Sequence, residues 1–544
     1  MGLVEDTKSM IDRMKTICSN YGLGNTGEEY EVITSMFLYK FLNDKFLYEI
    51  RKDASMFTNL SFAELEKKLN QMSEQEFENI ATENLSAISA KLKRENFISN
   101  LYNKQNIGNF HELLDNTLMD IADNNIDIFS GRTGAGTKLK LFKPISPCIK
   151  DIDKKDDFAK ALIDTISKFT FESAFKQTYD FFATIFEYLI KDYNKDNGEY
   201  GEYYTPHSIA TIIASILVPN GDKNVIIYDP SAGTGTLLLA LAHQIGDDKC
   251  TIYSQDIAQK SNELLRLNLI LNNLVGSLPN IIRDNTLTEP FHKRGNDLQK
   301  FDYIVSNPPF TTDFSAIRDI LASEAHRNRF FAGVPNIPNK NKRGMAIYLM
   351  FIQHILYSLN DKGRGAIVVP TGFLTAVSGI PLKIREYIIS HKILQGVISM
   401  PSNVFANTGT NVSILFLDKS ISNEQIMLID ASKLGEIVKE DKNQKTCLRA
   451  EDISLIVDTF NSKVEKDDFS ILVSNEEIKN KKYSFSPGQY FDIKIEYVKL
   501  TAQEFAAKMQ DFQTNLDTLF QESSKLEIEI KKQLEGITYV NKDN

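Results

Sequence analysis

Four consecutive residues, Asn307-Pro308-Pro309-Phe310, form the strongest chemical signal in the sequence. They close the apolar run over 301–307, which predicts a buried β-strand. Consecutive prolines hold the chain extended, so the Asn307 side chain and the Pro308 carbonyl would be fixed at the strand end. These two neutral acceptors suit an exocyclic amino group and stabilise the positive charge that grows on its nitrogen during attack on a methyl sulfonium. Phe310 offers an apolar face on which an extruded base could stack.

A second signal is the run VIIYDPSAGTGTLLLA, in which an apolar strand ends at Asp229 and Gly233 and Gly235 turn the chain into a helix. Small residues there let the backbone approach a nucleoside-bearing ligand closely. A strand-Gly-x-Gly-helix pattern alone fits NAD, FAD, S-adenosylmethionine or mere tight packing. Asp256 closes the next strand, where its carboxylate could accept hydrogen bonds from ribose hydroxyls, and the third glycine of the dinucleotide fingerprint is absent. The pattern favours a cofactor loop over a structural turn.

The elements that must position these residues are strands and helices in alternation. Short apolar, β-branched runs recur from about residue 170, at 225–229, 250–256, 280–284, 301–307, 365–370, 394–400 and 412–418. Continuous apolar strands separated by helices predict an α/β fold with a doubly wound, mostly parallel sheet covered on both faces. Ligands bind at the carboxyl ends of such strands, which is where Asp229, Asp256 and Asn307 lie.

The distribution of helix-like and strand-like segments along the chain predicts four regions. They are an all-α N-terminal domain (1–165), the sheet domain (166–420), a small mixed region (421–498) and a C-terminal helical tail (499–544). Within the first, SGRTGAGTK (130–138) has the glycine spacing of a phosphate loop. However, Thr137-Lys138 reverses the Lys-Ser/Thr order that this loop needs, and no apolar strand precedes it. We therefore interpret this segment as a mobile turn.

The C-terminal tail carries a heptad pattern. Positions at 4-3-4-3 spacing are apolar except for Ser523, and the apolar residues are Phe505, Met509, Phe512, Leu516, Leu519, Leu526 and Ile530. Such a seam favours docking against a helix of another subunit. The alternative is a terminal helix that packs on its own domain.

Composition restricts the class of protein. The 544 residues are 42% hydrophobic and 25% charged, which is typical of a globular protein. No apolar run reaches the ~18 residues that a membrane span needs, and the N-terminus is acidic and polar, so we expect a cytoplasmic protein with no membrane association. Cysteines and histidines form no ligand-spaced cluster, so no metal site is expected.

A net charge of −10 argues at first against nucleic acid. The segment RNRFFAGVPNIPNKNKR (327–343) is the exception, because it holds cations and no acid and follows the Asn-Pro-Pro-Phe segment. Its Pro, Asn and Gly content predicts a loop. We expect its cations to track phosphate beside an extruded base, against the alternative of a solvated surface loop. They are Arg327, Arg329, Lys340, Lys342 and Arg343.

At this point the residues carry a family resemblance. Asp229-Pro230-Ser231-Ala232-Gly233-Thr234-Gly235 together with the Asn-Pro-Pro-Phe segment resembles amino-methyltransferases that act on DNA. Gly201-Glu202-Tyr203-Tyr204-Thr205-Pro206 is similar to the GEFYTP element of type I restriction-modification methyltransferase (M) subunits. Further similar segments span most of the chain: RDNTLTEPF (283–291), GRGAIVVPTGFL (363–374), MPSNVFANTGTNVSILFLDK (400–419) and YSFSPGQYF (483–491).

The resemblance implies a fold, a cofactor and roles. It implies an S-adenosylmethionine-dependent methyltransferase sheet, transfer to the N6 amino group of a flipped adenine in double-stranded DNA, and catalysis by Asn307, Pro308, Pro309 and Phe310. The family has Asp or Asn at the position of Asn285, facing the cofactor's adenine, and here Asp284 is adjacent, so either could serve. The residues implied to bind the cofactor are Glu202, Tyr203, Tyr204, Thr205, Pro206, His207, Asp229, Ser231, Gly233, Thr234, Gly235, Thr236, Asp256 and Asn285.

The resemblance also implies partners. Between residues 170 and 420 little chain is left for a domain that reads base edges, and a separate specificity (S) subunit is expected to do so. Two M subunits would assemble on it, and a restriction (R) subunit would complete the complex. Two alternatives stay open: an amino-methyltransferase acting on RNA or on protein glutamine, and a non-enzymatic assembly or regulatory subunit of a DNA complex.

Overall fold

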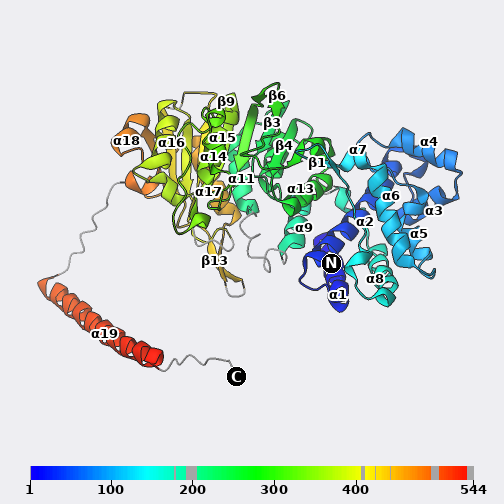
Figure 1. Cartoon of the computed structure of the whole chain (residues 1–544), viewed down its shortest axis with the longest axis horizontal. Helices are drawn as coiled ribbons and strands as arrows, with labels where there is room; N and C mark the ends of the chain where they lie inside the picture. Colours follow the sequence, from blue (N-terminus) through cyan, green and yellow to red (C-terminus); the bar gives the residue numbers. More distant parts are fainter. Residues whose placement is uncertain are drawn as a thin grey trace. The chain divides into compact units, whose positions relative to one another are not determined.

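The computed structural model describes residues 2–176, 179–191, 205–405, 411–422, 424–440, 443–491 and 501–535 (Figure 1). The chain divides into two compact units, 1–491 and 492–544. The first unit contains a helical region and one large sheet, and the second contains the helix α19 (Ala502–Glu535). None of the helices among the described residues is long and apolar enough to cross a membrane.

The N-terminal part of the first unit is helical. Its helices are α1 (Leu3–Asn20), α2 (Gly27–Asp53), α3 (Phe62–Gln71), α4 (Glu74–Asn84), α5 (Ile98–Asn103), α6 (Phe110–Asn124), α7 (Ile126–Phe129), α8 (Lys155–Ser167) and α9 (Tyr179–Lys191). Local sequence fixes several of their starts, since Ser61 and Ser73 each form a capping box with a glutamate three residues later. Buried aromatic rings fill the interior, with Phe37 and Phe41 both edge-on to Phe171.

An 11-stranded sheet forms the rest of the first unit, in the order β15-β12-β10-β11-β9-β8-β3-β4-β5-β1-β2. Neighbouring strands run parallel from β1 to β9 through β5, β4, β3 and β8, and β11 is antiparallel to both of its neighbours. The strands are β1 (Gly131–Thr133), β2 (Lys138–Leu139), β3 (Val225–Asp229), β4 (Cys250–Asp256), β5 (Ile281–Arg283), β8 (Phe301–Ser306), β9 (Leu359–Pro370), β10 (Leu394–Ser399), β11 (Val412–Asp418), β12 (Gln425–Asp430) and β15 (Ser470–Ser474). The predicted mostly parallel α/β sheet is therefore confirmed.

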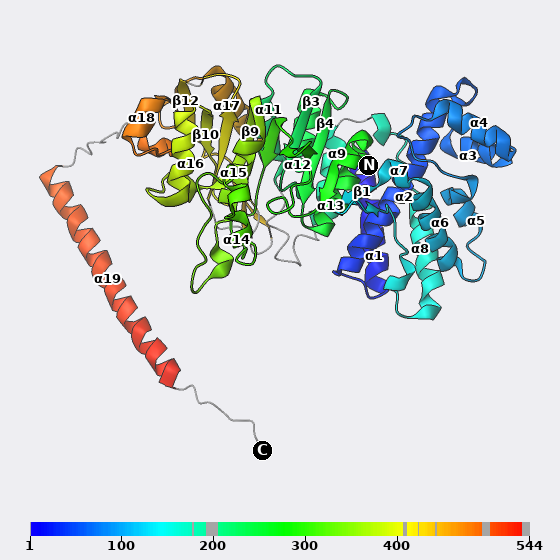
Figure 2. The ribbon, with the colours of Figure 1, turned by 45° about the horizontal axis from the view of Figure 1, so that its top comes forward.

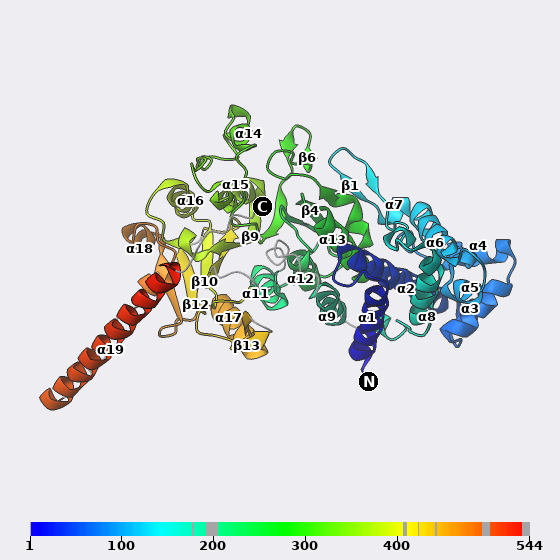
Figure 3. The same ribbon diagram turned by 60° about the horizontal axis from the view of Figure 1, so that its bottom comes forward.

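Helices cover both faces of this sheet (Figure 3). Side chains alternate between the two faces, so Ala366 and Val368 of β9 join one apolar cluster and Ile367 and Val369 join the other. The first face packs on α11 (His207–Leu217), α12 (Thr236–Ile245), α13 (Gln259–Leu271) and α17 (Ala450–Ser462). The second face packs on α15 (Tyr348–Ser358), α16 (Gly379–Ser390) and α18 (Asn475–Asn480). Burial on both faces explains why the strands read as continuous apolar runs.

Two segments differ from the sequence-based interpretation. The glycine-rich segment 130–138 contains the predicted turn, but the turn connects β1 and β2 of a hairpin, in which β1 also pairs in parallel with β5. The region after residue 420 is not separate from the sheet either, because β12 pairs with β10 and β15 pairs with β12. Both ends of the sheet are thus built from chain outside the predicted sheet domain, as Figure 2 shows for β1 and β12.

The second unit is a 34-residue helix with an apolar seam. The seam residues are between 51% and 60% exposed, namely Phe505, Met509, Phe512, Leu516, Leu519, Leu526 and Ile530. A row of large apolar side chains at this spacing is normally covered by another helix. Within the described residues of this unit no second helix is present to cover it.

Candidate active site

The polar residues singled out in the sequence meet at one edge of the sheet. Asp229 and Asp256 are the last residues of β3 and β4, and Asp284 and Asn307 directly follow β5 and β8. These four strands are adjacent and parallel, so their carboxyl ends lie side by side. This edge is where open α/β sheets bind ligands.

The loop after β3 is shaped by its glycines. Gly235 has φ +83°, a conformation that disfavours any side chain, and a Cβ atom there would overlap Leu265 of α13. Gly233 also has a positive φ, of 52°, and its N–H donates to Oδ2 of Asp256 at 2.9 Å. Thr234 is buried and Thr236 opens α12. The loop is therefore held against β4 through its backbone.

Two carboxyl groups lie buried at this edge. Burial raises the pKa of Asp229 to about 8; the Ser231 N–H, at 2.9 Å from Oδ1, opposes that rise, and the nearby charge of Asp256 adds to it. Burial raises the pKa of Asp256 as well, although the N–H groups of Gly233 and Ala258 donate to its two oxygens. No cation pairs with either carboxyl group among the described residues. A ligand with a positive charge and hydroxyl groups would supply what this pair lacks.

Asn307 is oriented by a hydrogen bond from a distant part of the chain. Its Nδ2 donates to the hydroxyl of Thr205, which is buried, at 3.2 Å. With the amide nitrogen engaged in this way, Oδ1 is the atom that remains as an acceptor at the end of β8. Pro206 caps α11, with its carbonyl accepting from Ile209 at 3.0 Å, so the Thr205 hydroxyl sits on a fixed helix start just before His207.

The methylene and ring surfaces beside Asn307 are apolar. Pro308 is buried, Pro309 is partly buried, and the ring of Phe310 lies 6.4 Å from that of Tyr348 in an edge-to-face contact. Tyr348 in turn packs edge-on to Phe373 at 6.1 Å. A partly buried ring supported by two further rings is a rigid surface for stacking.

Ser306 links the two chemical signals, and the sequence reasoning missed it. Its hydroxyl lies 2.7 Å from the hydroxyl of Ser231, which joins the end of β8 to the loop after β3. The segment after β5 is tied to the same loop, since the hydroxyl of Thr286 donates to the carbonyl of Pro230 at 2.7 Å. The signal that could have found Ser306 is a small polar residue at the last position of a buried apolar strand.

The side chain of Asn285 forms hydrogen bonds within its own turn. Its Oδ1 accepts from the N–H of Leu287 at 3.0 Å and from that of Thr288 at 3.4 Å. Asp284, beside it, accepts from the Asn285 N–H at 2.7 Å. Both side chains lie at the end of β5, and the predicted cofactor residues Glu202, Tyr203 and Tyr204 lie outside the described residues.

The basic loop differs from its prediction at one position. Arg329 is buried, its guanidinium donates to the carbonyl of Leu287, and it lies 4.3 Å from the ring centroid of Phe330. It therefore anchors the loop inside the protein. The prediction that Arg329 contacts phosphate from the surface is wrong. The remaining cations of the set are exposed, namely Arg327, Lys340, Lys342 and Arg343. Arg327 forms an exposed ion pair with Glu324 at 3.1 Å.

The residues present fit S-adenosylmethionine. The glycine loop permits close backbone approach, the buried carboxyl groups of Asp229 and Asp256 suit an ammonium group and ribose hydroxyls, and Asn307 directs a neutral acceptor toward the same edge. When bound, this cofactor supplies an activated methyl group.

Comparison with known proteins agrees with this geometry. The fold is that of a solved type I restriction-modification methyltransferase subunit from Streptococcus thermophilus, with a TM-score of 0.71, 21% sequence identity, and coverage of 90% of this chain and 100% of that one. The chain thus has the fold class of this subunit, an α/β sheet domain with a helical region.

The family follows from the sequence. The model of the N-6 DNA Methylase family matches residues 177–497, and the chain belongs to this family. It is 29% identical over 435 residues to the type I restriction enzyme MpnII methylase subunit of Mycoplasma pneumoniae, covering 76% of this chain and 78% of that protein. It is 28% identical over 378 residues to the HindI methylase subunit of Haemophilus influenzae, covering 66% and 79%.

Proposed function

We propose that the chain transfers a methyl group from S-adenosylmethionine to the N6 amino group of adenine in double-stranded DNA. It would act as the methyltransferase subunit of a type I restriction-modification complex, at a site chosen by a separate specificity subunit. The observation that carries the proposal is the orientation of Asn307 by Thr205, which presents a neutral acceptor next to a glycine loop and two buried carboxyl groups.

The chain's own residues perform the substrate side of the reaction. Extrusion of the target base costs a few kcal/mol, which stacking on Phe310 offsets in part. The amino group donates one N–H to Oδ1 of Asn307 and the other to the carbonyl of Pro308. Both acceptors strengthen their hydrogen bonds as positive charge develops on the nitrogen, so they stabilise the transition state more than the bound substrate. The methylated nitrogen then loses one of its two protons to solvent and becomes neutral.

The cofactor would occupy the edge between β3 and β5. Asp256 would accept from the ribose hydroxyls, the loop from Ser231 to Thr236 would line the chain that bears the sulfur, and Asp284 or Asn285 would face the adenine. Thr205, Pro206 and His207 would close the site from the start of α11, together with Glu202, Tyr203 and Tyr204. The hydrogen bond between Ser231 and Ser306 supports this arrangement, because it ties the cofactor loop to the catalytic strand.

The exposed cations of the basic loop would contact DNA phosphates. Their buried neighbour Arg329 fixes the loop to Leu287, beside the segment that follows β5. Gln353 of α15 fixes it again, because its side-chain oxygen accepts from Ala332 at 2.8 Å and its nitrogen donates to Gly333 at 3.1 Å. An anchored loop can present cations beside an extruded base at a low entropic cost.

Neutralising the four exposed cations should flatten the salt dependence of DNA binding. Each lost phosphate contact lowers the slope of log K against log [salt] by about one, so a variant of Arg327, Lys340, Lys342 and Arg343 to glutamine should lose up to about four. Affinity measured across a salt series, with the specificity subunit present, tests this. A control variant removes equal charge from exposed residues of the helical region, namely Lys67, Lys68, Lys91 and Lys104. Equal slopes for both variants would contradict the proposed contact.

The seam of α19 would dock on helices of the specificity subunit. Its apolar residues are exposed and spaced for a helical partner. Two copies of the chain would bind one specificity subunit, and a restriction subunit would join them. A protein that modifies chromosomal DNA of a prokaryote works in the cytoplasm, and this is the compartment that we propose.

The proposal is tested by transfer of labelled methyl from S-adenosylmethionine. The chain with its specificity subunit should label duplex DNA at adenine N6, identified by digestion to nucleosides, and the chain alone should label it far less. Label on RNA or on protein glutamine in place of DNA would favour the other methyltransferase alternative. Cofactor binding without any transfer would favour the non-enzymatic one.

A further inference from the structure

A fifth parallel strand ends at the same edge of the sheet as the cofactor residues. β1 runs parallel to β5, with Arg132 opposite Ile282 and Thr133 opposite Arg283. The residue after β1 is Gly134, and the residue after β5 is Asp284. The hairpin that begins with β1 comes from the helical region, so this region reaches the site through the tip of the hairpin.

Gly134 and Asp284 are packed so closely that a side chain at 134 has no room. A Cβ atom on Gly134 would overlap Oδ2 of Asp284 and lie 2.8 Å from its Cγ. Gly134 has no positive φ, so alanine could adopt its backbone conformation, and the three atoms nearest to its Cβ would all belong to the side chain of Asp284. The Gly134 N–H donates to the carbonyl of Arg283 at 3.3 Å, which holds the two segments together.

Asp284 is in turn attached to the cofactor residues. Its N–H donates to the carbonyl of Asp256 at 3.1 Å, and its Oδ1 accepts from Asn285 at 2.7 Å. A displacement of the Asp284 carboxylate therefore acts on the ends of both β4 and β5. The contact with Gly134 limits the rotation of this carboxylate on the side that faces the hairpin.

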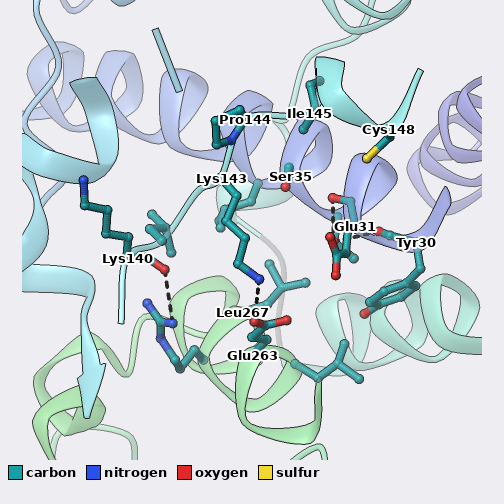
Figure 4. Close-up of a pocket in the computed structure, with 15 residues that line it drawn as sticks. Tyr30, Glu31, Ser35, Lys140, Lys143, Pro144, Ile145, Cys148, Glu263 and Leu267 are labelled. Atoms are coloured by element: carbon teal, nitrogen blue, oxygen red, sulfur yellow. Dashed lines mark hydrogen bonds and ion pairs between the residues drawn. The ribbon is translucent and has the colours of Figure 1, made fainter. Parts of the chain in front are cut away.

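The base of the hairpin is anchored by α13. Arg266 is buried, and its Nη2 donates to the carbonyls of Phe129 at 2.7 Å and Leu139 at 3.0 Å. Gly131 allows this approach, since a Cβ atom there would lie 2.9 Å from Cδ of Arg266. Nearby, Lys143 pairs with Glu263 of α13 at 3.1 Å beside a cavity between α2 and α13 (Figure 4).

The same helix holds the cofactor loop. Asn268 of α13 donates to the carbonyl of Thr234 at 3.2 Å, and Leu265 packs on Gly235. One rigid helix thus fixes both the hairpin and the glycine loop. The tip of the hairpin is consequently held at a defined distance from the cofactor edge.

We propose that Gly134 is a positioning residue of the cofactor site, which acts by keeping the Asp284 carboxylate in place at the adenine end. This inference rests on the proposed function and extends it. Through this contact, cofactor affinity depends on the docking of the helical region on the sheet. The glycine is required because its Cα forms part of the wall against which Asp284 lies.

A double-mutant cycle tests the proposal on the full chain. Gly134→Ala should weaken binding of S-adenosylmethionine about tenfold, because the added methyl group displaces Asp284. In an Asp284→Ala background the same substitution should change the dissociation constant less than about twofold, since Oδ2 and Cγ, the two atoms nearest to the added methyl group, are then absent and only Cβ of residue 284, at 3.1 Å, stays beside it. Gly108→Ala is the matched control, because that glycine has open space around it and no positive φ.

Two further measurements separate positioning from a general structural effect. The Tm of the cofactor-free Gly134→Ala variant should stay close to that of the Gly108→Ala variant. Binding of 5′-methylthioadenosine, which lacks the amino-acid end, should weaken by the same factor as binding of the whole cofactor. An effect of Gly134→Ala that persists unchanged in the Asp284→Ala background, or no effect at all, would overturn the proposal. Failure of the wild-type chain to bind the cofactor would instead overturn the proposed function.

Discussion

Replacing Asn307 with alanine should lower the rate of methyl transfer by more than about a thousandfold, while the dissociation constant of the cofactor changes less than about twofold. The side chain of Asn307 supplies a neutral acceptor for the amino group that becomes positively charged, and alanine supplies none. The cofactor edge is formed by other residues, the loop after β3 and the carboxyl groups of Asp229 and Asp256.

The measurement is single-turnover transfer of labelled methyl in the complex with the specificity subunit, beside equilibrium binding of the cofactor. Thr205→Val is the matched variant, since it keeps the shape of the side chain and removes only the acceptor that orients Asn307. We expect a loss of about tenfold from it, because an unrestrained Asn307 still provides its oxygen in part of the population. Transfer by Asn307→Ala at the wild-type rate would show that the mechanism is wrong.

Removing the chain after residue 500 should abolish association with the specificity subunit and leave cofactor binding intact. The cut removes α19, which carries the seam, and it falls outside the compact unit 1–491 that holds the site. Burial of seven large side chains on a partner helix stabilises a complex strongly, so the loss should be complete in co-purification. DNA methylation should fall with it.

A subtler pair of variants shows whether the seam itself is responsible. Leu516→Glu with Leu519→Glu places charge on the seam, and Thr514→Glu with Thr518→Glu places the same charge on the same turns of α19 away from it. Only the first pair should prevent co-purification. If the truncated chain still co-purifies with the specificity subunit, the docking surface lies in the unit 1–491.

Most of the sheet could be predicted because its strands are locally marked. The predicted strands 225–229, 250–256 and 412–418 agree residue for residue with β3, β4 and β11. Each is a run of apolar, β-branched residues bounded by turn residues, and burial on both faces makes such a run continuous. The carboxyl-end rule for parallel strands then places Asp229, Asp256 and Asn307 together without any knowledge of distant contacts.

The other features of the fold and the site depend on contacts between residues far apart in the sequence, which no local pattern indicates. β1 has three residues, with Gly131 first, and it is a strand because β2 and the distant β5 pair with it. Arg329 sits in a run of exposed cations, and arginine is rarely buried, so only the structure reveals that its guanidinium reaches the carbonyl of Leu287. The contact of Gly134 with Asp284 likewise joins residues far apart in the sequence and has no local signal.

The pairing of β1 with β5 has a consequence for synthesis of the protein. Arg132 lies opposite Ile282, so the partner strand leaves the ribosome 282 − 132 = 150 residues later. At elongation rates of about 5–20 residues per second this interval is on the order of ten seconds. During that time the helical region can fold around its own core, but the edge of β1 that later pairs with β5 stays unpaired. The pairing of β1 with β5 is therefore the last step in assembling the helical region, and it cannot occur before the ribosome has translated the sheet as far as β5.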